Sequence, residues 1–343
     1  SRAFFHADAI RRVYVQLPEE DAQEGMCGLL GKSMYGTRDA AQNWGQCYMT
    51  FMVKTGFTKG LASHCCFFHK ERNIRCVVHG DDFTLLGARK DLDWFRERMQ
   101  EKFPVKFRGR LGPTDKDDKE IRILNRIITW TDEGILYEAD QRHAEIIIKE
   151  MNLKSDSKTA VTPFEKTLGI ENDPLVESAE ATQYRGIVAR GNYLAQDRTD
   201  LGYAVKELSK EMSCPRREGW GKLKRLARYL KGRPRLVMRF DYQSEVKGLT
   251  VWTDTDFAGC VKSRKSTSAG LIQLGGHLGK SWSTNQAVIA LSSGEAEYYG
   301  LVKGASMGLG AASIIRDLGV EYEEPLEIRT DASAAIGIAN RIG

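Results

Sequence analysis

Three acidic residues near the end of the chain have the types and surroundings that metal-assisted hydrolysis requires. Asp254 lies on an expected strand, Glu297 in the first turns of an expected helix, and Asp331 at the end of a later strand. Carboxylates from strand ends and a facing helix can converge, and two Mg²⁺ ions about 3.5–4 Å apart need several such ligands. The pattern predicts phosphodiester hydrolysis, with one ion activating the attacking water and the other stabilising the leaving oxygen.

The neighbours of these acids sharpen the prediction and leave one alternative open. Asp256 lies on the same face of the period-two strand as Asp254, so spacing alone does not separate the two. Ser292 and Glu295 have the spacing of a capping box, which commits Glu295 to the backbone and leaves Glu297 to face the strands. Each acid taken singly is more often a solvated surface group, so the prediction rests on the combination.

A second acidic pair, Asp81 and Asp82, separates two apolar runs within residues 76–87. This pattern predicts a tight hairpin with both carboxylates at its tip. Adjacent carboxylates repel unless a cation bridges them, and polymerases place such a pair where Mg²⁺ holds the triphosphate and the primer 3′ oxygen. Gly-Asp-Asp is also ordinary turn composition, which is the alternative interpretation.

The stretch from residue 220 to 235 combines an apolar helical face with positive charge and has no acidic residue. Apolar residues recur at helical spacing at Trp220, Leu223, Leu226, Tyr229 and Leu230. The basic residues are Lys222, Lys224, Arg225, Arg228, Lys231, Arg233 and Arg235. The pattern favours a positive ridge that contacts phosphates, with a solvated surface helix as the alternative.

Other chemistries fit less well. The seven cysteines form no Cys-x-x-Cys pair, which favours a reducing compartment over a disulfide framework. Residues 64–69 contain two histidines and two adjacent cysteines, but adjacent cysteines do not easily occupy separate corners of a tetrahedral zinc site. No run of 18 apolar residues exists, and the first residues lack the features of a signal peptide.

The length of 343 residues, with 41% hydrophobic and 28% charged residues, indicates an ordinary globular protein of about two domains. In the first half we expect a helix over 89–102, an exposed loop or linker over 108–120, strands over 121–130 and 134–138, and a helix over 141–151. A polar connection over 154–174 precedes three helices, at 177–196, 201–212 and 219–231. In the last hundred residues we expect strands over 249–254, 268–274 and 278–284, and a helix from about residue 295. A strand over 326–330 and a second helix from about residue 333 follow.

Five ordered motifs near the end of the chain resemble the ribonuclease H domain of copia-type retrotransposon polyproteins. They lie at residues 253–259, 264–270, 281–283, 292–298 and 330–335. The resemblance implies that Asp254, Glu297 and Asp331 bind the metals. It also places a further acidic or histidine residue of the family beyond Gly343.

Residues 30–44 resemble the reverse transcriptase signature of the same family, and residues 184–188, 198–205 and 229–232 resemble its connection between the two enzymes. The resemblance places Tyr35, Gly36 and Arg38 near the nucleotide and template, and His79 beside the primer terminus; for Trp44 we expect core packing. Three departures are His79-Gly80 where the family has an aromatic residue and Val, Ala41 for Pro, and Asp39 for Gln. The family's first palm aspartate falls before Ser1.

We therefore predict an α+β / α/β chain: a truncated reverse transcriptase palm and fingers over 1–153, a linker and helical connection over 154–245, and a ribonuclease H-like mixed sheet flanked by helices over 246–343. The implied activities are RNA-directed DNA synthesis and ribonuclease H cleavage, each with two Mg²⁺ ions, or Mn²⁺. The implied partners are an RNA template, a DNA primer, an RNA–DNA hybrid and deoxynucleoside triphosphates, with no membrane. The implied location is the cytoplasm, in virus-like particles that can enter the nucleus, and the protein is not expected to be secreted.

Two alternatives remain at this point. A decayed or co-opted element would bind nucleic acid without catalysis, as the unusual His79-Gly80 and the positions beyond both ends suggest. A metal-dependent nuclease acting on DNA, such as a transposase, would share the later fold. The signature over residues 32–44 argues against the transposase.

Overall fold

The computed structural model describes residues 2–166 and 172–341, so part of the expected connection over 154–174 lies outside the described residues. The chain divides into two compact units. Unit 1 comprises Ser1–Phe107 and Leu309–Glu321, and unit 2 comprises Arg108–Gly308 and Tyr322–Gly343. The division falls at the start of the polar stretch 108–120 that we expected to be an exposed loop or linker.

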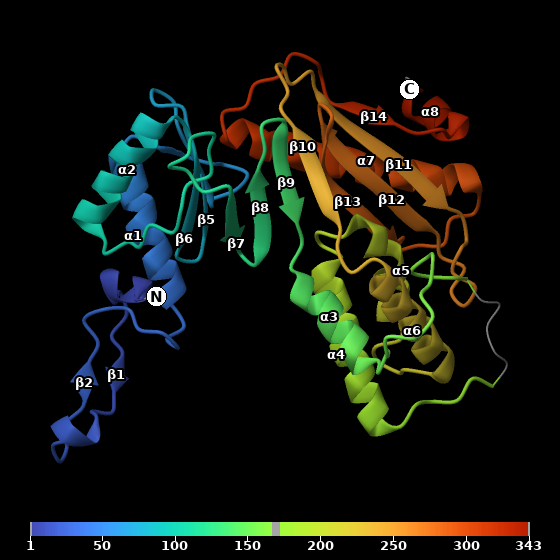
Figure 1. Ribbon diagram of the computed structural model, residues 1–343, viewed down its shortest axis with the longest axis horizontal. Helices are drawn as coiled ribbons and strands as arrows, with labels where there is room; N and C mark the ends of the chain where they lie inside the picture. The colour runs from blue at the N-terminus through green and yellow to red at the C-terminus, as the bar shows by residue number, and fades with distance from the viewer. Residues whose placement is uncertain (1, 167–171, 342–343) are drawn as a thin grey trace. The chain divides into compact units, whose positions relative to one another are not determined.

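Unit 1 is built on an antiparallel sheet in the order β3-β4-β5-β6, formed by Thr58–Lys59, Cys66–His69, Ile74–His79 and Asp82–Leu86. Helices α1 (Ala40–Lys54) and α2 (Arg89–Lys102) pack on it (Figure 1). Helix α2 has the bounds that the sequence predicts, and its Phe95 and Met99 are buried together with Ile74 and Cys76 of the sheet. The small hairpin of β1 (Tyr14–Val15) and β2 (Gly28–Leu29), and the short 3₁₀ helices Ala3–His6 and Glu19–Asp21, complete the unit.

The first sheet of unit 2 has the order β10-β9-β8-β7, from Val237–Asp241, Gly134–Glu138, Arg126–Trp130 and Glu120–Ile123, with every pair antiparallel. The single strand expected over 121–130 is wrong, because the chain turns back between β7 and β8. Leu124 and Asn125 both have positive φ, 47° and 67°, as a two-residue type I′ turn requires. Leucine rarely adopts this conformation, so the turn has no clear sequence signal.

Strand β10 is absent from our predictions, and it changes where the units divide. It pairs along its length with β9, so residues expected in the connection and in the palm region share one sheet. The compact units accordingly divide after Phe107 and not at residue 153. Composition identifies exposed loops, whereas pairing between strands about a hundred residues apart depends on the assembled sheet.

Four helices of unit 2 form a bundle with one apolar core. They are α3 (Gln141–Glu150), α4 (Ser178–Leu194), α5 (Gly202–Ser209) and α6 (Arg217–Gly232), with the 3₁₀ turn Thr199–Leu201 before α5. The last three helices lie in the range expected for the helical connection, and α3 lies in the range expected for the palm region. Leu223, Leu226 and Leu230 of α6 are fully buried against Ile147 and Ile187. The apolar face that the sequence predicts for α6 is therefore the face that joins the bundle.

The last part of unit 2 is a mixed sheet in the order β13-β12-β11-β14 with α7 across one face (Figure 1). Its elements in chain order are β11 (Leu249–Asp256), β12 (Thr267–Leu274), β13 (His277–Asn285), α7 (Ser293–Asp317), β14 (Glu327–Arg329) and α8 (Ser333–Ala339). The residues of α7 from Leu309 onward are assigned to unit 1. The first three strands are antiparallel and β14 is parallel to β11, which confirms the predicted order of strands and helices. Across the described residues, no helix has both the length and the apolar character needed to cross a membrane.

Candidate active site

The alternation of β11 decides which side chains reach the site. Leu249, Val251, Thr253 and Thr255 are buried, whereas the residues between them are more exposed. Asp254 therefore lies on the open face of the sheet, which is the face away from α7. Strand β14 pairs with β11 only from Thr250 to Trp252, so the edge of β11 beside Asp254 is unpaired and side chains from both faces can meet around it.

Three glycines let helix α7 lie very close to β11. A Cβ atom on Gly300, Gly304 or Gly308 would lie 2.4, 2.3 or 2.8 Å from the side chains of Thr255, Thr253 and Val251, respectively. Each distance is shorter than a normal carbon contact, so only glycine fits at this approach. The glycines recur at every fourth position, a spacing that places them on one side of the helix and that the sequence alone displays. The close approach brings Glu297, one turn earlier, against Thr255.

We expect Gly304→Ala to lower the free energy of unfolding by about 1–3 kcal/mol, because the added methyl group forces the helix away from Thr253. Urea denaturation checks this value. Gly310→Ala is the matched control, since a Cβ there meets nothing within 4 Å and alanine favours the helix by about 0.5–1 kcal/mol. Equal effects of the two substitutions would contradict the close approach.

The start of α7 confirms the predicted capping box. The Ser292 hydroxyl accepts a hydrogen bond from the backbone N–H of Glu295 at 3.1 Å, and the Glu295 carboxylate accepts one from the N–H of Leu291 at 2.8 Å. Glu295 is thereby committed to the helix terminus. Glu297 is left to approach β11, as the sequence predicts.

Glu297 is the point where the three carboxylates interact. Burial raises its pKa, and the charges of Asp254 and Asp331 raise it further. Its Oε2 atom is buried and has no hydrogen-bond partner among the described residues. A buried carboxylate oxygen without a partner is unfavourable unless a cation neutralises it. The three acids that the sequence singled out therefore lie within electrostatic reach of one another.

These carboxylates fit a hard divalent cation, although they do not form a finished cage. Among the described residues, no three His, Cys, Asp or Glu side chains are close enough together to hold a metal ion. Mg²⁺ is normally held by one or two carboxylates, waters and substrate phosphates, so it does not need such a cage. Asp256 forms an ion pair with Lys166 at 2.7 Å, which favours Asp254 as the ligand.

The predicted hairpin of unit 1 is present. Strands β5 and β6 are joined through Gly80 and Asp81, with His79 opposite Asp82 and Gly80 at φ 64°. Asp81 is exposed and Asp82, the first residue of β6, is half-buried. The indole N–H of Trp44 in α1 donates to the Gly80 carbonyl at 2.9 Å, so this core residue also anchors the hairpin tip.

We expect Trp44→Phe to lower stability by about 0.5–1.5 kcal/mol, because the part-buried hydrogen bond that the indole donates to the Gly80 carbonyl is lost. Urea denaturation gives the value. Trp94→Phe serves as the control: its ring packs under Arg72 at 3.9 Å, a contact that phenylalanine retains. A control that loses as much stability would argue against the role of the Trp44 hydrogen bond.

Packing within the chain explains part of the loop over residues 30–39, which precedes α1. Tyr35 stacks on Phe4 with ring centroids 4.2 Å apart and remains 43% exposed. Gly36 has φ 90° with open space around it, and Arg38 is exposed. The predicted contacts of these three residues with nucleotide and template remain predictions.

The basic face of α6 is less open than the sequence suggests. Lys222 pairs with Glu218 at 2.9 Å, Arg225 pairs with Glu165 at 2.6 Å, and Lys231 donates to the carbonyls of Ser155 and Ser157. The segment before residue 167 thus lies along the helix and uses part of its charge. Arg228 is half-buried, whereas Lys224 is exposed.

A cavity of about 650 Å³ borders the acidic face of β11. One wall comes from α4, α5 and the turn between them, and includes Gln196, Thr199 and Tyr203. The floor is the open face of the sheet and includes Asp254 and Asp256. We refer to this cavity as the groove.

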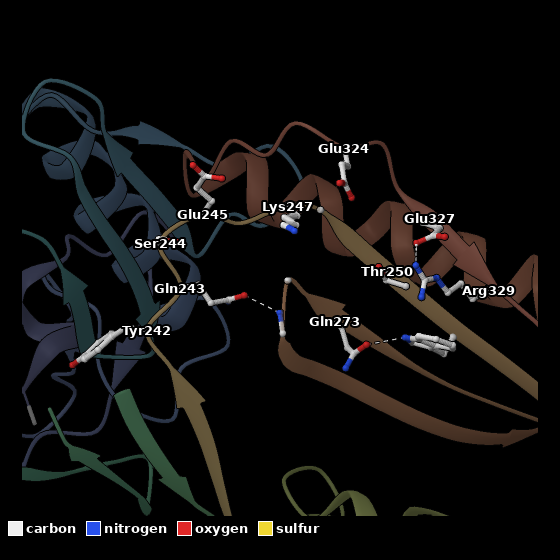
Figure 2. A pocket seen from close by; sticks show the side chains of 14 residues that line it. Tyr242, Gln243, Ser244, Glu245, Lys247, Thr250, Gln273, Glu324, Glu327 and Arg329 are labelled. Atoms are coloured by element: carbon white, nitrogen blue, oxygen red, sulfur yellow. Dashed lines mark hydrogen bonds and ion pairs between the residues drawn. The ribbon is translucent and has the colours of Figure 1, made fainter. Parts of the chain in front are cut away.

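A second cavity, of about 550 Å³, lies at the other end of β11 (Figure 2). Figure 2 shows Glu245 and Glu324 beside Lys247 at its rim, and Glu327 paired with Arg329. Three glutamates against two cations leave it poorly suited to phosphate. The groove is therefore the better candidate for binding a nucleic acid.

Comparison with known proteins places these features in context. Residues 1–166 match the family described as reverse transcriptase (RNA-dependent DNA polymerase). The chain is 26% identical over 339 residues to the retrovirus-related Pol polyprotein from transposon RE2 of Arabidopsis thaliana, covering 96% of this chain and 22% of that protein. It is 25% identical over 352 residues to the corresponding polyprotein from transposon TNT 1-94 of Nicotiana tabacum, covering 98% and 26%. This chain thus spans about a quarter of the length of these relatives.

A likeness also exists to a solved structure of a foamy viral protease-reverse transcriptase in complex with double-stranded DNA. Its TM-score is 0.44 at 12% identity, with 90% of this chain and 44% of that chain covered.

Proposed function

Since this chain belongs to the Pol polyproteins of copia-type retrotransposons, we propose that it serves RNA-directed DNA synthesis and the removal of the copied RNA. The polymerase centre would lie in unit 1, at the hairpin of Asp81 and Asp82. The ribonuclease H centre would lie at Asp254, Glu297 and Asp331 of unit 2.

One observation carries the nuclease proposal. Glu297 is half-buried and its Oε2 atom is buried without a hydrogen-bond partner among the described residues, while burial and the charges of Asp254 and Asp331 raise its pKa. A bound Mg²⁺ pair would supply an activated water and charge neutralisation at the leaving oxygen. The chain itself would hold three carboxylates in a fixed relation: Asp254 by the pleat of β11, Glu297 by the capped start of α7, and Asp331 by the end of β14.

The polymerase proposal rests on the family match over residues 1–166 and on the hairpin. Asp81 and Asp82 would bind the metals, Mg²⁺ or Mn²⁺, that hold a deoxynucleoside triphosphate and the primer 3′ oxygen. His79 would lie beside the primer terminus, and Tyr35, Gly36 and Arg38 near the template and nucleotide. The Trp44 hydrogen bond would keep the hairpin tip in register with α1.

The proposed partners are an RNA template, a DNA primer and their hybrid. Backbone contacts would come from positive charge without reading sequence. Of the basic residues on α6, the exposed Lys224 is best placed for this, because Lys222, Arg225 and Lys231 have partners within the chain.

The direct test is a cleavage assay on an end-labelled RNA annealed to DNA, with Mg²⁺ or with EDTA. We expect Mg²⁺-dependent cleavage of the RNA strand in the hybrid, and none of single-stranded RNA or duplex DNA. Primer extension on an RNA template in the same buffer tests the polymerase. Cleavage of duplex DNA without cleavage of the hybrid would instead support a DNA nuclease.

A second candidate is nucleic-acid binding without catalysis. The described residues contain no group of three metal-ligating side chains close enough to hold an ion, and His79-Gly80 replaces the pair that the family has before its two aspartates. Salt-sensitive binding of the hybrid, with neither extension nor cleavage in Mg²⁺ or Mn²⁺, would support this candidate.

A further inference from the structure

A stretch of irregular backbone crosses the basic side of α6. Residues 155–166 belong to unit 2 and contain no helix or strand. At the C-terminal end of the helix, the Lys231 ammonium donates hydrogen bonds to the carbonyls of Ser155 and Ser157, at 2.7 and 2.5 Å. We refer to residues 155–166 as the strap.

The second half of the strap reaches the middle of the same helix. Arg225 donates to the Thr162 hydroxyl at 2.9 Å and pairs with Glu165 at 2.6 Å. The Lys222 ammonium lies 5.8 Å from the centre of the Phe164 ring. In every one of these contacts the strap offers an electron-rich group to a cation of α6: a carbonyl, a hydroxyl, a carboxylate or a ring face. The strap therefore occupies space around these cations that a phosphate group would need.

The strap is attached weakly to the bundle. Each of its residues is exposed or half-buried, and Val161 is 84% exposed. Among the described residues, one backbone hydrogen bond joins the strap to α6, from the Ala160 N–H to the Arg228 carbonyl at 3.3 Å. Ala160 and Phe164 pack against the apolar core of the bundle, each of them half-buried. Exposed ion pairs contribute little and exposed hydrogen bonds open readily, so the strap can leave α6 while the bundle stays folded.

The far end of the strap reaches strand β11. Lys166 pairs with Asp256 at 2.7 Å, two residues from Asp254 on the same face of the strand. Phe164 packs edge-on against Tyr203 of α5, with ring centroids 5.5 Å apart. Lys166 and Tyr203 both line the groove. A movement of the strap away from α6 therefore also moves a side chain that lines the groove.

We propose that the strap is an autoinhibitory cover of α6, and that the phosphate backbone of a nucleic acid displaces it to reach Arg225 and Lys231. The inference rests on the proposed nucleic-acid binding and adds its regulation. Phosphates carry a full charge and bind arginine through two oxygens, so they compete well with carbonyls and with one exposed carboxylate. The apparent affinity is then proportional to the fraction of chains whose strap is open. Displacement also withdraws Lys166 from the groove, so binding at α6 opens the edge of the groove beside Asp256.

The first test locks the strap onto the helix with a disulfide. A Cβ atom on Gly232, the last residue of α6, would lie 3.1 Å from the Cβ of Thr159, near the separation of about 3.5–4.5 Å that a disulfide requires. The double variant Thr159→Cys, Gly232→Cys is measured oxidised and reduced, and peptide mass spectrometry verifies the bond. The wild type, with its own seven free cysteines, receives the same oxidation as a control. Fluorescence anisotropy in EDTA follows binding of a labelled RNA–DNA hybrid to the whole 343-residue chain over a range of salt concentrations.

We expect the oxidised double variant to bind the hybrid about tenfold more weakly than its reduced form, and the reduced form to match the wild type. Because Arg225 and Lys231 no longer meet phosphates, the salt dependence should also weaken, with the slope of log affinity against log salt smaller by about 2. A loss of affinity from general distortion would not change this slope. Circular dichroism checks that both forms are folded.

A second variant loosens the strap instead. Glu165→Gln removes the carboxylate that pairs with Arg225, and we expect about threefold tighter binding of the hybrid. Glu133→Gln is the matched control, because it removes the same charge from an exposed ion pair with Arg239 of β10. Binding by the control should be nearly unchanged.

Hydrogen exchange of the strap gives the direct readout. We expect the peptide covering residues 155–166 to exchange faster in the complex than in the free protein, because the Ala160 N–H loses its acceptor. If the wild type binds the hybrid but the disulfide leaves the affinity unchanged, or the strap exchanges no faster in the complex, this inference is overturned while the proposed function stands. If the wild type does not bind the hybrid, both fail.

Discussion

Asp254→Asn is expected to reduce Mg²⁺-dependent cleavage of the RNA strand by at least about 10³-fold at saturating metal. The substitution removes the charge of a proposed oxygen ligand where a metal pair would contribute several kcal/mol to the transition state, and each 1.4 kcal/mol corresponds to tenfold in rate. Single-turnover cleavage of an end-labelled hybrid, with protein in excess, measures the chemical step.

Asp256→Asn is the matched control for this prediction. It removes the same charge from the same face of the same strand, two residues away, but from a carboxylate that is paired with Lys166. We expect its rate to remain within a few-fold of the wild type. If instead Asp256→Asn abolishes cleavage and Asp254→Asn does not, the roles of the two aspartates are exchanged.

Arg198→Ala is expected to lower the free energy of unfolding by about 3–5 kcal/mol. The Arg198 side chain is almost fully buried, and its guanidinium donates to both oxygens of Asp200 at 2.9 and 2.7 Å and to the carbonyls of Arg233 and Pro234. Removing one partner of a buried ion pair leaves the other charge uncompensated, and here two carbonyls also lose their donor. Urea denaturation followed by circular dichroism gives the value.

Arg239→Ala is the control for this buried pair. Its guanidinium also contacts two carboxylates, those of Glu133 and Asp241, but all three side chains are more than half exposed. Exposed pairs contribute at most about 1 kcal/mol, so we expect a correspondingly small loss. Similar losses for the two arginines would contradict the assignment of Arg198 and Asp200 as a buried ion pair that stabilises the bundle.

The ion pair of Arg198 and Asp200 also predicts how the stability of the fold depends on pH. Burial acts to raise the pKa of Asp200, but the hydrogen bonds from Arg198 and Tyr229 outweigh it, and the pKa lies below its ordinary value. A carboxylate with a lowered folded-state pKa stabilises the fold above its ordinary pKa and loses that contribution as the pH falls through the folded value. Acid titration should therefore destabilise the wild type more steeply than Arg198→Ala, which lacks the pair.

Local features of the candidate sites were predictable from the sequence because neighbouring residues determine them. The capping box at Ser292 and Glu295 follows from two residue types at a fixed spacing, and it correctly left Glu297 to approach β11. The Gly80–Asp81 turn follows from a glycine between two apolar runs. The alternation along β11 correctly placed Asp254 and Asp256 on one face, because the side-chain period of a strand is two.

Contacts between distant parts of the chain required the assembled structure. The pairing of β10 with β9, the hydrogen bond from Trp44 to Gly80, and the partners of Arg225 and Lys231 join segments that carry no mutual signal. The pair of Lys222 with Glu218 is local, since the two residues are four apart on α6. The choice between Asp254 and Asp256 was likewise left open by spacing. The ion pair of Asp256 with Lys166, ninety positions earlier, is a tertiary contact that favours Asp254.

By itself the sequence determined the types of the acids, the strands and helix that carry them, and the family to which the chain belongs. These depend on periods, caps and turns that act over a few residues. Only the tertiary structure decided that α7 packs against β11 through its glycines, that the charges of Asp254 and Asp331 raise the pKa of Glu297, and that a groove borders Asp254. Burial and mutual distance are properties of the packed chain, and no short stretch of residues encodes them.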